Sequence, residues 1–380
     1  MRDIRYQIAV DEKPDNALTE EAAEIEVQQT IDGPTTFRIK FAIDICRGDF
    51  NLLDDPRLSP GVRDRKVTIV AHLNGKGHVL AHGIITERKV NLAEGGPGSS
   101  LEIVGQDRRL VMGRKPLSKA HEGTASQMVK QILQEHGFET DVTETKIQYE
   151  EDKGTLNQAE ETQLAFVTKQ SGRNGHYFWI DWRVGVGFAG FEVTETAHFK
   201  PSPPQPERNG FGFVPPLLLA PEGVTELKLN VADGCSNVAS FELHANGEAP
   251  NQSGTVQRVN SDDGEVADTS VPGPTTAPLG ERPPASPEAR ERRLPTAGDA
   301  QEARVRSEAA LNDASWSVQA TAETSVQALN GFVAPHQIVK VSGAGALNSG
   351  DYFVKAVTHT VDSAAHKLRI ELLRNAFGGA

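Results

Sequence analysis

Residues 121–138 read HEGTASQMVKQILQEHGF, a stretch that carries the signals of one complete amphipathic helix. Thr124 stands three residues before Gln127, which is the spacing of a capping box at a helix N-terminus. The apolar residues that follow recur at helical spacing and would form one stripe: Met128, Val129, Ile132 and Leu133. Gly137 is the residue type that most often follows a helix, because glycine adopts the left-handed conformation without steric cost. The stretch therefore predicts a helix that begins after Thr124 and ends before Gly137.

A second stretch, residues 156–181, reads LNQAEETQLAFVTKQSGRNGHYFWID. Residues 164–167 predict another helix, which Gly172 would end, and the aromatic run 177–180 has the character of a strand. Together the two stretches predict a helix, a polar linker, a second helix and a strand. We expect them to form one helix-containing insert over residues 116–195.

The chain before this insert alternates between apolar and polar residues. Residues 4–10, 37–45 and 67–73 have the period of two that is typical of half-buried strands. A glycine-rich turn after residue 74 predicts a hairpin between 67–73 and the apolar residues that follow. Several strands with short turns within residues 1–115 predict a small antiparallel barrel or sandwich.

A second group of strand-like segments follows the insert and predicts a second barrel, built from residues 196–246 and 299–380. Its segments are 224–231, 237–243, 315–320, 331–341, 351–360 and 368–372. Between its two parts, residues 247–298 are rich in Pro, Ser, Thr and charge and contain almost no large apolar residue. Such a segment cannot bury enough surface to offset its ordering entropy, so we expect a flexible or extended insertion there. Asp299 can then cap a helix from Ala300 to Ala314.

Composition limits the classes of function. The chain has 380 residues, enough for two or three domains, and a formal net charge of −13, which argues against a nucleic-acid-binding surface as its main function. No apolar run approaches the roughly 20 residues of a membrane helix, and the N-terminus has no signal-peptide core, so we expect the protein to stay in the cytoplasm where it is made. The two cysteines, Cys46 and Cys235, lie beside apolar runs and are interpreted as buried thiols.

The insert and the C-terminus carry a resemblance to a known family. The insert has a capped helix ending His136-Gly137-Phe138, then Gln158 and residues 160–167; the C-terminus has Gly350-Asp351-Tyr352-Phe353-Val354, then His359, then Leu372-Leu373-Arg374-Asn375. This pattern resembles the late control protein D family. The usual family run Asn-Glu-Thr-Asp is here Glu160-Glu161-Thr162-Gln163, a departure at two of four positions. The resemblance covers residues 100–200 and 298–380 well, the N-terminal strands loosely, and the insertion not at all.

The resemblance implies a fold and an assembly. The family supplies the baseplate hub of contractile phage tails and injection systems, and its fold is shared by the N-terminal part of the type VI secretion spike protein. It implies a β-rich α+β fold with two small antiparallel tube-type β-barrel domains. It also implies a homotrimer whose pseudo-sixfold ring joins a sixfold tail tube to a threefold spike. The implied partners are the spike protein, the tail tube protein and baseplate wedge proteins, with the tape-measure protein or cargo in the lumen left open. We expect no sequence-specific binding of nucleic acid and no insertion into a membrane.

The motifs of common enzymes are weak or missing in the sequence. Gly185–Gly190 matches G-x-G-x-x-G, but a strand-like run follows where a dinucleotide site needs a helix, so we predict a hairpin turn. His72, His78 and His82 lack the spacing and companion ligands of a metal site. No nucleophile elbow, zinc-protease motif or P-loop occurs. We therefore predict no catalytic, cofactor-binding or metal-binding residues, no cofactor and no enzymatic activity.

Two alternatives remain open at this point, a cell-wall hydrolase of the tail tip and a free-standing β-rich adhesin. A hydrolase predicts a carboxylate pair in a cleft. An adhesin predicts a monomer with exposed aromatic residues. The net charge further suggests an acidic lumen for the ring. The kind of particle also stays open: phage, bacteriocin or extracellular injection system.

Overall fold

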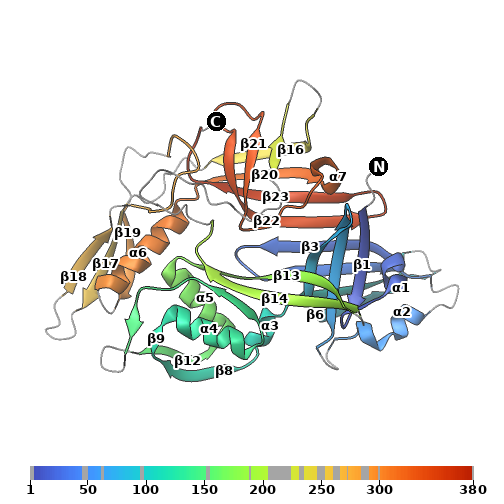
Figure 1. Ribbon diagram of the computed structural model, residues 1–380, viewed down its shortest axis with the longest axis horizontal. Helices are drawn as coiled ribbons and strands as arrows, with labels where there is room; N and C mark the ends of the chain where they lie inside the picture. The colour runs from blue at the N-terminus through green and yellow to red at the C-terminus, as the bar shows by residue number, and fades with distance from the viewer. Residues whose placement is uncertain are drawn as a thin grey trace.

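The computed structural model of the chain describes residues 4–44, 50–60, 64–94, 98–150, 155–187, 190–203, 224–230, 235–245, 253–259, 266–271, 273–283, 291–297 and 300–378. Figure 1 shows the N-terminal strands at the right, the C-terminal strands at the top and the green helical insert below them. The helices are α1 (Asn16–Glu21), α2 (Asn51–Asp54), η2 (Pro56–Leu58), α3 (Arg109–Met112), α4 (Ala125–Glu135), α5 (Gln163–Asn174), α6 (Ala300–Ala314) and α7 (Val326–Leu329).

Strands make up most of the described chain, which is β-rich as predicted. In chain order they are β1 (Ile4–Val10), β2 (Lys13–Pro14), β3 (Ala22–Thr30), β4 (Thr36–Ala42), β5 (Lys66–Leu73), β6 (Lys76–Asn91), β7 (Ser100–Asp107), β8 (Pro116–His121), β9 (Gly123–Thr124), β10 (Glu139–Val142), β11 (Gln148–Tyr149), β12 (Leu156–Thr162), β13 (Tyr177–Gly187), β14 (Gly190–Lys200), β15 (Glu226–Lys228), β16 (Val238–Ala245), β17 (Ser253–Val259), β18 (Val266–Val271), β19 (Glu291–Ala297), β20 (Val318–Ser325), β21 (Ile338–Ser342), β22 (Gly350–Asp362) and β23 (His366–Arg374).

The largest sheet contains the same arrangement of strands twice. In the N-terminal half the neighbours run β3-β4-β7-β6-β5-β1, and in the C-terminal half they run β16-β20-β23-β22-β21-β15. Each half therefore follows the same path through its first, second, fifth, fourth and third strands, and then adds one strand from earlier in the chain. We call the two halves the first repeat and the second repeat. The sequence predicted two groups of strands, and the strand order that they share is evident only in the topology.

Each repeat contains one long strand whose first and second parts pair with different neighbouring strands. The first part of β6 pairs with β5, and its second part continues beyond β5 along β7. The first part of β22 pairs with β21, and its second part pairs with β23 on one edge and with β3 on the other. Both long strands have a bulge at the change, between Ile85 and Glu87 in β6 and between Val354 and Ala356 in β22. A bulge bends a strand and increases its twist, which lets one strand pass from one layer to the next.

The pairing of β22 with β3 joins the two repeats into one 13-stranded sheet. Each repeat has its own apolar core on one face of this sheet, with Phe37, Ile39 and Phe41 in the first and Tyr352, Val354 and Ile370 in the second. The sheet path ends at β16 and at β2, and no pairing among the described strands closes either repeat into a barrel. The prediction of two tube-type barrels within one chain therefore stays a prediction.

The hairpin predicted after residue 67 is confirmed, and its turn is formed by Asn74 and Gly75. Both residues have positive φ angles, 53° and 79°, as a two-residue turn with right-handed strand twist requires. The strands β5 and β6 on either side pair from Lys66 opposite Ile84 to Leu73 opposite Lys76.

The helical insert forms as the sequence predicts, with one correction. The capping box of α4 is present, because Thr124 accepts from the Gln127 amide and the Gln127 side chain accepts from Thr124. Gly137 follows α4 with a φ of 77°. The prediction that Gly172 ends the second helix is wrong: α5 continues to Asn174, and Gly175, with a φ of 66°, takes the left-handed position. A glycine ends a helix only where the backbone turns left-handed, and Gly172 does not.

Two further predictions need correction. Part of the segment 247–298 that we expected to be flexible forms a three-stranded sheet in the order β18-β17-β19, and α6 lies beside it (Figure 1). Strand pairing satisfies the backbone of this segment even though its composition offers little apolar surface. Cys235 is exposed rather than buried, and Cys46 lies outside the described residues. The predicted bounds of α6 are confirmed, whereas Asp299, its expected cap, also lies outside the described residues.

A buried ion pair fastens the insert to the first repeat. Asp107 ends β7, and Arg109 binds its carboxylate at 2.7 Å while both side chains are almost fully buried. Arg109 also donates to the Phe178 carbonyl of β13 at 2.8 Å and to the Gly33 carbonyl at 2.6 Å. One guanidinium thus connects three segments that are far apart in the sequence.

The C-terminal Arg374-Asn375 dipeptide has a structural role. Arg374 is fully buried and donates to the carbonyl oxygens of Leu279, Ser349 and Gly378. The Asn375 amide group accepts from the Leu279 backbone amide and donates to the Ala277 carbonyl. The two side chains bind residues 277–279 to the end of β23, so this part of the resemblance to a known family is explained by packing.

We predict that Arg374→Met lowers the free energy of unfolding by at least about 3 kcal/mol, because several buried carbonyls lose their donor at once. Urea unfolding measures this. The matched control is Arg369→Met on the same strand, where an exposed arginine pairs with Glu323 and the loss should stay below about 1 kcal/mol. Equal losses in the two variants would contradict the structural role of Arg374.

Candidate functional site

One face of the large sheet is polar across the eight neighbouring strands β16-β20-β23-β22-β3-β4-β7-β6. The strand register places the following side chains on it: Ser240, Glu242, His244, Thr321, Glu323, Lys367, Arg369, Glu371, Thr358, Thr360, Glu24, Glu26, Arg38, Lys40, Glu102, Glu87 and Lys89. We call this surface the polar face. The apolar cores of both repeats lie on the other side of the same strands. The polar face therefore crosses from one repeat to the other without an interruption.

Charges on the polar face are arranged as cross-strand ion pairs. Arg38 binds Glu24 at 2.6 Å, Glu26 at 2.8 Å and Glu102 at 3.2 Å. Lys89 lies 3.6 Å from Glu102, and Arg369 lies 3.4 Å from Glu323. The hydrogen bond that Arg38 donates to Glu26 is the largest cause of the raised pKa of Arg38. Acidic and basic groups thus pair on this surface, and acidic groups remain in excess, because one Arg38 is shared by three glutamates.

Both ends of the polar face are open among the described strands. At one end β16 pairs with β20 alone. At the other end residues 86–92 extend past β5 and pair, as far as Asn91, only with β7. We call residues 86–92 the β6 arm. Unpaired strand edges are binding surfaces for another strand, because their backbone donors and acceptors are available.

The three histidines of the β5–β6 hairpin lie apart. His78 stacks against Phe332 with ring centroids 4.5 Å apart. His82 is buried, and its Nδ1 lies 2.8 Å from the Thr68 hydroxyl. The register between β5 and β6 shifts between these two histidines, so their side chains lie on opposite faces of the strand. No group of three metal-ligating side chains occurs among the residues that the structure describes.

Thr68, His82 and Glu195 have the residue types of a hydrolase triad, but the geometry does not serve catalysis. His82 Nε2 lies 4.0 Å from the Glu195 carboxylate, beyond hydrogen-bond distance. The Thr68 hydroxyl belongs to a residue with no exposed surface, so a substrate has no access to it. Burial lowers the pKa of His82 to about 3 and raises the pKa of Glu195. Arg108 binds Glu195 and the His136 carbonyl, which gives the cluster a structural role between β14 and α4.

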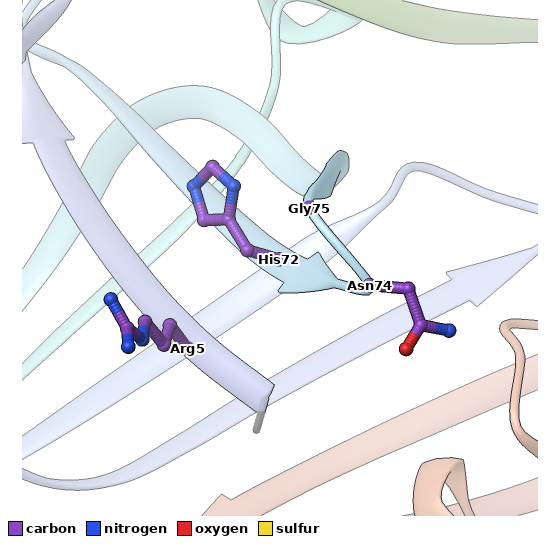
Figure 2. A pocket seen from close by; sticks show the side chains of 4 residues that line it. All are labelled: Arg5, His72, Asn74 and Gly75. Carbon is purple, nitrogen blue, oxygen red and sulfur yellow. The ribbon is translucent and has the colours of Figure 1, made fainter. Parts of the chain in front are cut away.

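A hollow of about 430 Å³ opens at the start of β1 and is lined by Arg5, His72, Asn74 and Gly75. Figure 2 shows Arg5 and His72 projecting to the same side from paired strands, while Asn74 points away from them. This lining contains no carboxylate and no nucleophile, so the hollow does not indicate hydrolysis.

The literal G-x-G-x-x-G motif lies in a hairpin, as predicted. Gly187 at the end of β13 pairs with Gly190 at the start of β14, and no helix begins there. Residues 188–189 between them lie outside the described residues. The geometry for holding a pyrophosphate at a helix N-terminus is therefore missing.

A chain of buried hydrogen bonds connects the two repeats. Tyr6 of β1 bonds His366 at 2.8 Å, and His366 bonds His359 at 2.9 Å. Burial lowers the pKa of His359 to about 3 and that of His366 to about 4. Both imidazoles are therefore neutral when the repeats are packed together. The sequence did not predict that His359 and His366 would be linked to Tyr6 of β1, because this contact joins residues that are far apart in the chain.

Comparison with solved structures identifies the fold. The tail protein from Neisseria meningitidis MC58 matches at a TM-score of 0.64 and 12% identity, over 98% of this chain and 97% of that one. The prophage MuSo2 43 kDa tail protein from Shewanella oneidensis matches at 0.63 and 10% identity, over 99% and 100% of the two chains. The E. coli c3393 protein, a component of the type VI secretion system, matches at 0.51 and 13% identity, over 100% and 79%.

The chain therefore has the fold of these phage tail proteins. A type VI secretion component shares this fold. The resemblance inferred from the sequence is confirmed at the level of the fold. No protein-family model and no curated protein sequence matches the chain. No helix in the described part of the chain is long and apolar enough to span a membrane.

We predict that the protein loses stability as pH falls below about 6.5. The folded state holds His359 neutral, whereas the unfolded chain protonates it near pH 6.5, so the unfolded state binds more protons at lower pH. His359 alone should cost about 2 kcal/mol of unfolding free energy between pH 7.5 and pH 5. Urea unfolding at the two pH values measures the change, and His359→Asn should make the pH dependence shallower. An unchanged dependence in that variant would contradict this assignment.

Proposed function

We propose that the chain is a structural baseplate hub, or spike-tube adaptor, of a contractile phage tail or injection system. Three copies form a ring, and each copy contributes two similar units. In this proposal residues 1–115 form the first tube-type unit, and residues 196–246 with 299–380 form the second. Residues 116–195 form a peripheral insert, and 247–298 a segment outside the two tube-type units.

The observation that carries this proposal is the internal repeat. Both repeats use the same strand order and the same bulged long strand, and β22 joins them edge to edge. A trimer of such a chain presents six similar units around one axis, while its other surfaces repeat three times. This combination matches a sixfold tube on one side and a threefold spike on the other. The fold shared with phage tail proteins supports the same interpretation.

The polar face is suited to line the channel of such a ring. Many of its charges are paired with one another, so a passing polymer meets few isolated charged groups. Glutamates outnumber lysines and arginines on this face, and the acidic lumen expected from net charge stays part of the proposal. The partners we propose are the spike protein, the tail tube protein and baseplate wedge proteins. The assembled tail or injection particle is the proposed location.

The proposed role is carried by binding surfaces and needs no catalysis. A tail-tip hydrolase and a free-standing adhesin are the competing functions. The cluster of Thr68, His82 and Glu195, which has hydrolase residue types, is sealed from solvent at Thr68. Among the described residues, Phe50 is the one large aromatic side chain that is exposed. A single exposed aromatic residue does not form the binding groove that an adhesin needs.

The test is the native mass of the purified protein, alone and with the product of its neighbouring spike gene. We expect a particle with three times the chain mass in at least one sample, and a ring with a central hole by negative stain. Clearing of a peptidoglycan suspension would favour a hydrolase instead. A strict monomer in both samples would contradict the hub.

A further inference from the structure

The joint between the two repeats shows in detail how one repeat contacts the next. The second part of β22 lies antiparallel to β3, with His359 opposite Val27 and Val361 opposite Ile25. These four side chains lie on the core side and have relative exposures of 1%, 0%, 6% and 4%. The joint therefore buries a row of three apolar side chains and one histidine beneath a polar face that continues across it.

The bulges allow the two repeats to be aligned residue by residue. In the long strands, Glu87 and Ala356 follow equivalent bulges, so Val90 occupies the position of His359 and Leu92 that of Val361. The opposing strands align by a second pair of bulges, since Glu24 and Ser240 follow them. Leu243 then occupies the position of Val27, and Phe241 that of Ile25.

The residues of the internal joint are buried, whereas their equivalents in the β6 arm and in β16 are exposed or only partly buried. Val90 is 43% exposed and Leu92 is 54% exposed, whereas their equivalents in β22 are buried. Phe241 and Leu243 are only partly buried, whereas Ile25 and Val27 are sealed. Large apolar side chains are thus left open at both ends of the polar face, at the positions that the internal joint covers.

We propose that the β6 arm of one copy pairs with β16 of the next copy and reproduces the internal joint between molecules. Val90 then lies opposite Leu243, and Leu92 lies opposite Phe241. The partner is a second copy of this chain. This inference rests on the proposed ring and specifies its subunit interface.

Strand direction agrees with this pairing. Consecutive strands from β16 to β6 are all antiparallel, and the path contains an even number of them, so its two ends run in opposite directions. Copies related by rotation would therefore meet as antiparallel neighbours, as β22 and β3 do. Such a head-to-tail contact uses two different surfaces and produces a closed ring when the rotation is suitable.

Side-chain chemistry also agrees. The register places Val90 and Leu92 beside Leu243 and Phe241 on the core side, which removes four apolar side chains from water. On the polar face, Lys89 lies diagonal to Glu242, an attractive pair at cross-strand distance. Slipping the register by one residue would bring apolar side chains onto the polar face.

Cysteine cross-linking tests the register. Val90→Cys and Leu243→Cys are combined in one chain that also carries Cys46→Ser and Cys235→Ser. Directly opposite residues bring their Cβ atoms to roughly 4.5–5.5 Å, close enough for a disulfide after small adjustment. We expect covalent dimers and trimers on a non-reducing gel, and monomers after reduction. The matched control is Val90→Cys with Glu242→Cys, which places the two thiols on opposite faces and should not cross-link.

The outcomes distinguish a failure of the proposed interface from a failure of the proposed hub function. Trimers that cross-link no better through Val90/Leu243 than through Val90/Glu242 would overturn the register and leave the hub standing. Efficient cross-linking of the Leu243→Cys single variant would instead show that two β16 edges meet, which also overturns it. A protein that stays monomeric with and without the spike would overturn both proposals.

A charge variant tests the interface without relying on disulfide geometry. Val90→Lys with Leu92→Lys should weaken trimer formation at least about tenfold, because two apolar side chains no longer leave water. The fold should be unaffected, since both positions are exposed in the isolated chain. Leu117→Lys is the control: it changes a residue on β8 that is 41% exposed, away from both ends of the polar face. Equal trimer stability in the two variants would contradict the pairing.

Discussion

The pairing of β22 with β3 is the contact on which the rest of the architecture depends. It joins the two repeats edge to edge, keeps both apolar cores on one side, and continues the polar face on the other. Because side chains alternate along a strand, a shift of one residue at this joint would reverse both faces. The buried pairs His359–Val27 and Val361–Ile25 therefore fix the register as well as contributing burial.

Buried polar groups hold the remaining units in place. Arg109 connects the insert to the first repeat, Tyr6 and two histidines connect β1 to the second repeat, and Arg374 fixes residues 277–279. Each of these groups would be costly to leave unpaired, so each favours one relative placement of the units over others. Apolar contact alone is less selective, since it has no directional requirement.

A hub acts through accessible binding surfaces, whereas an enzyme needs an accessible group of reactive side chains. The buried Thr68, His82 and Glu195 cluster is sealed, whereas the groups left accessible are strand edges and ion-paired side chains. In the proposed ring, the strand edges serve assembly and the paired charges line the passage. The proposed ring uses the same kind of joint inside each copy and between copies, so one type of strand pairing is sufficient to close the ring.

Local signals in the sequence determined the elements that depend on neighbouring residues: the capping box of α4, the Asn74–Gly75 hairpin, the bounds of α6 and the alternating strands. They also pointed to the family resemblance. The tertiary structure alone decided what depends on distant residues. The end of α5 depends on which glycine turns left-handed, strands β17 to β19 depend on pairing partners, and the repeat depends on strand order. The exposure of Val90 and Leu92 gained its meaning only when their equivalents in β22 were seen to be covered, because burial is a property of neighbours brought together by folding.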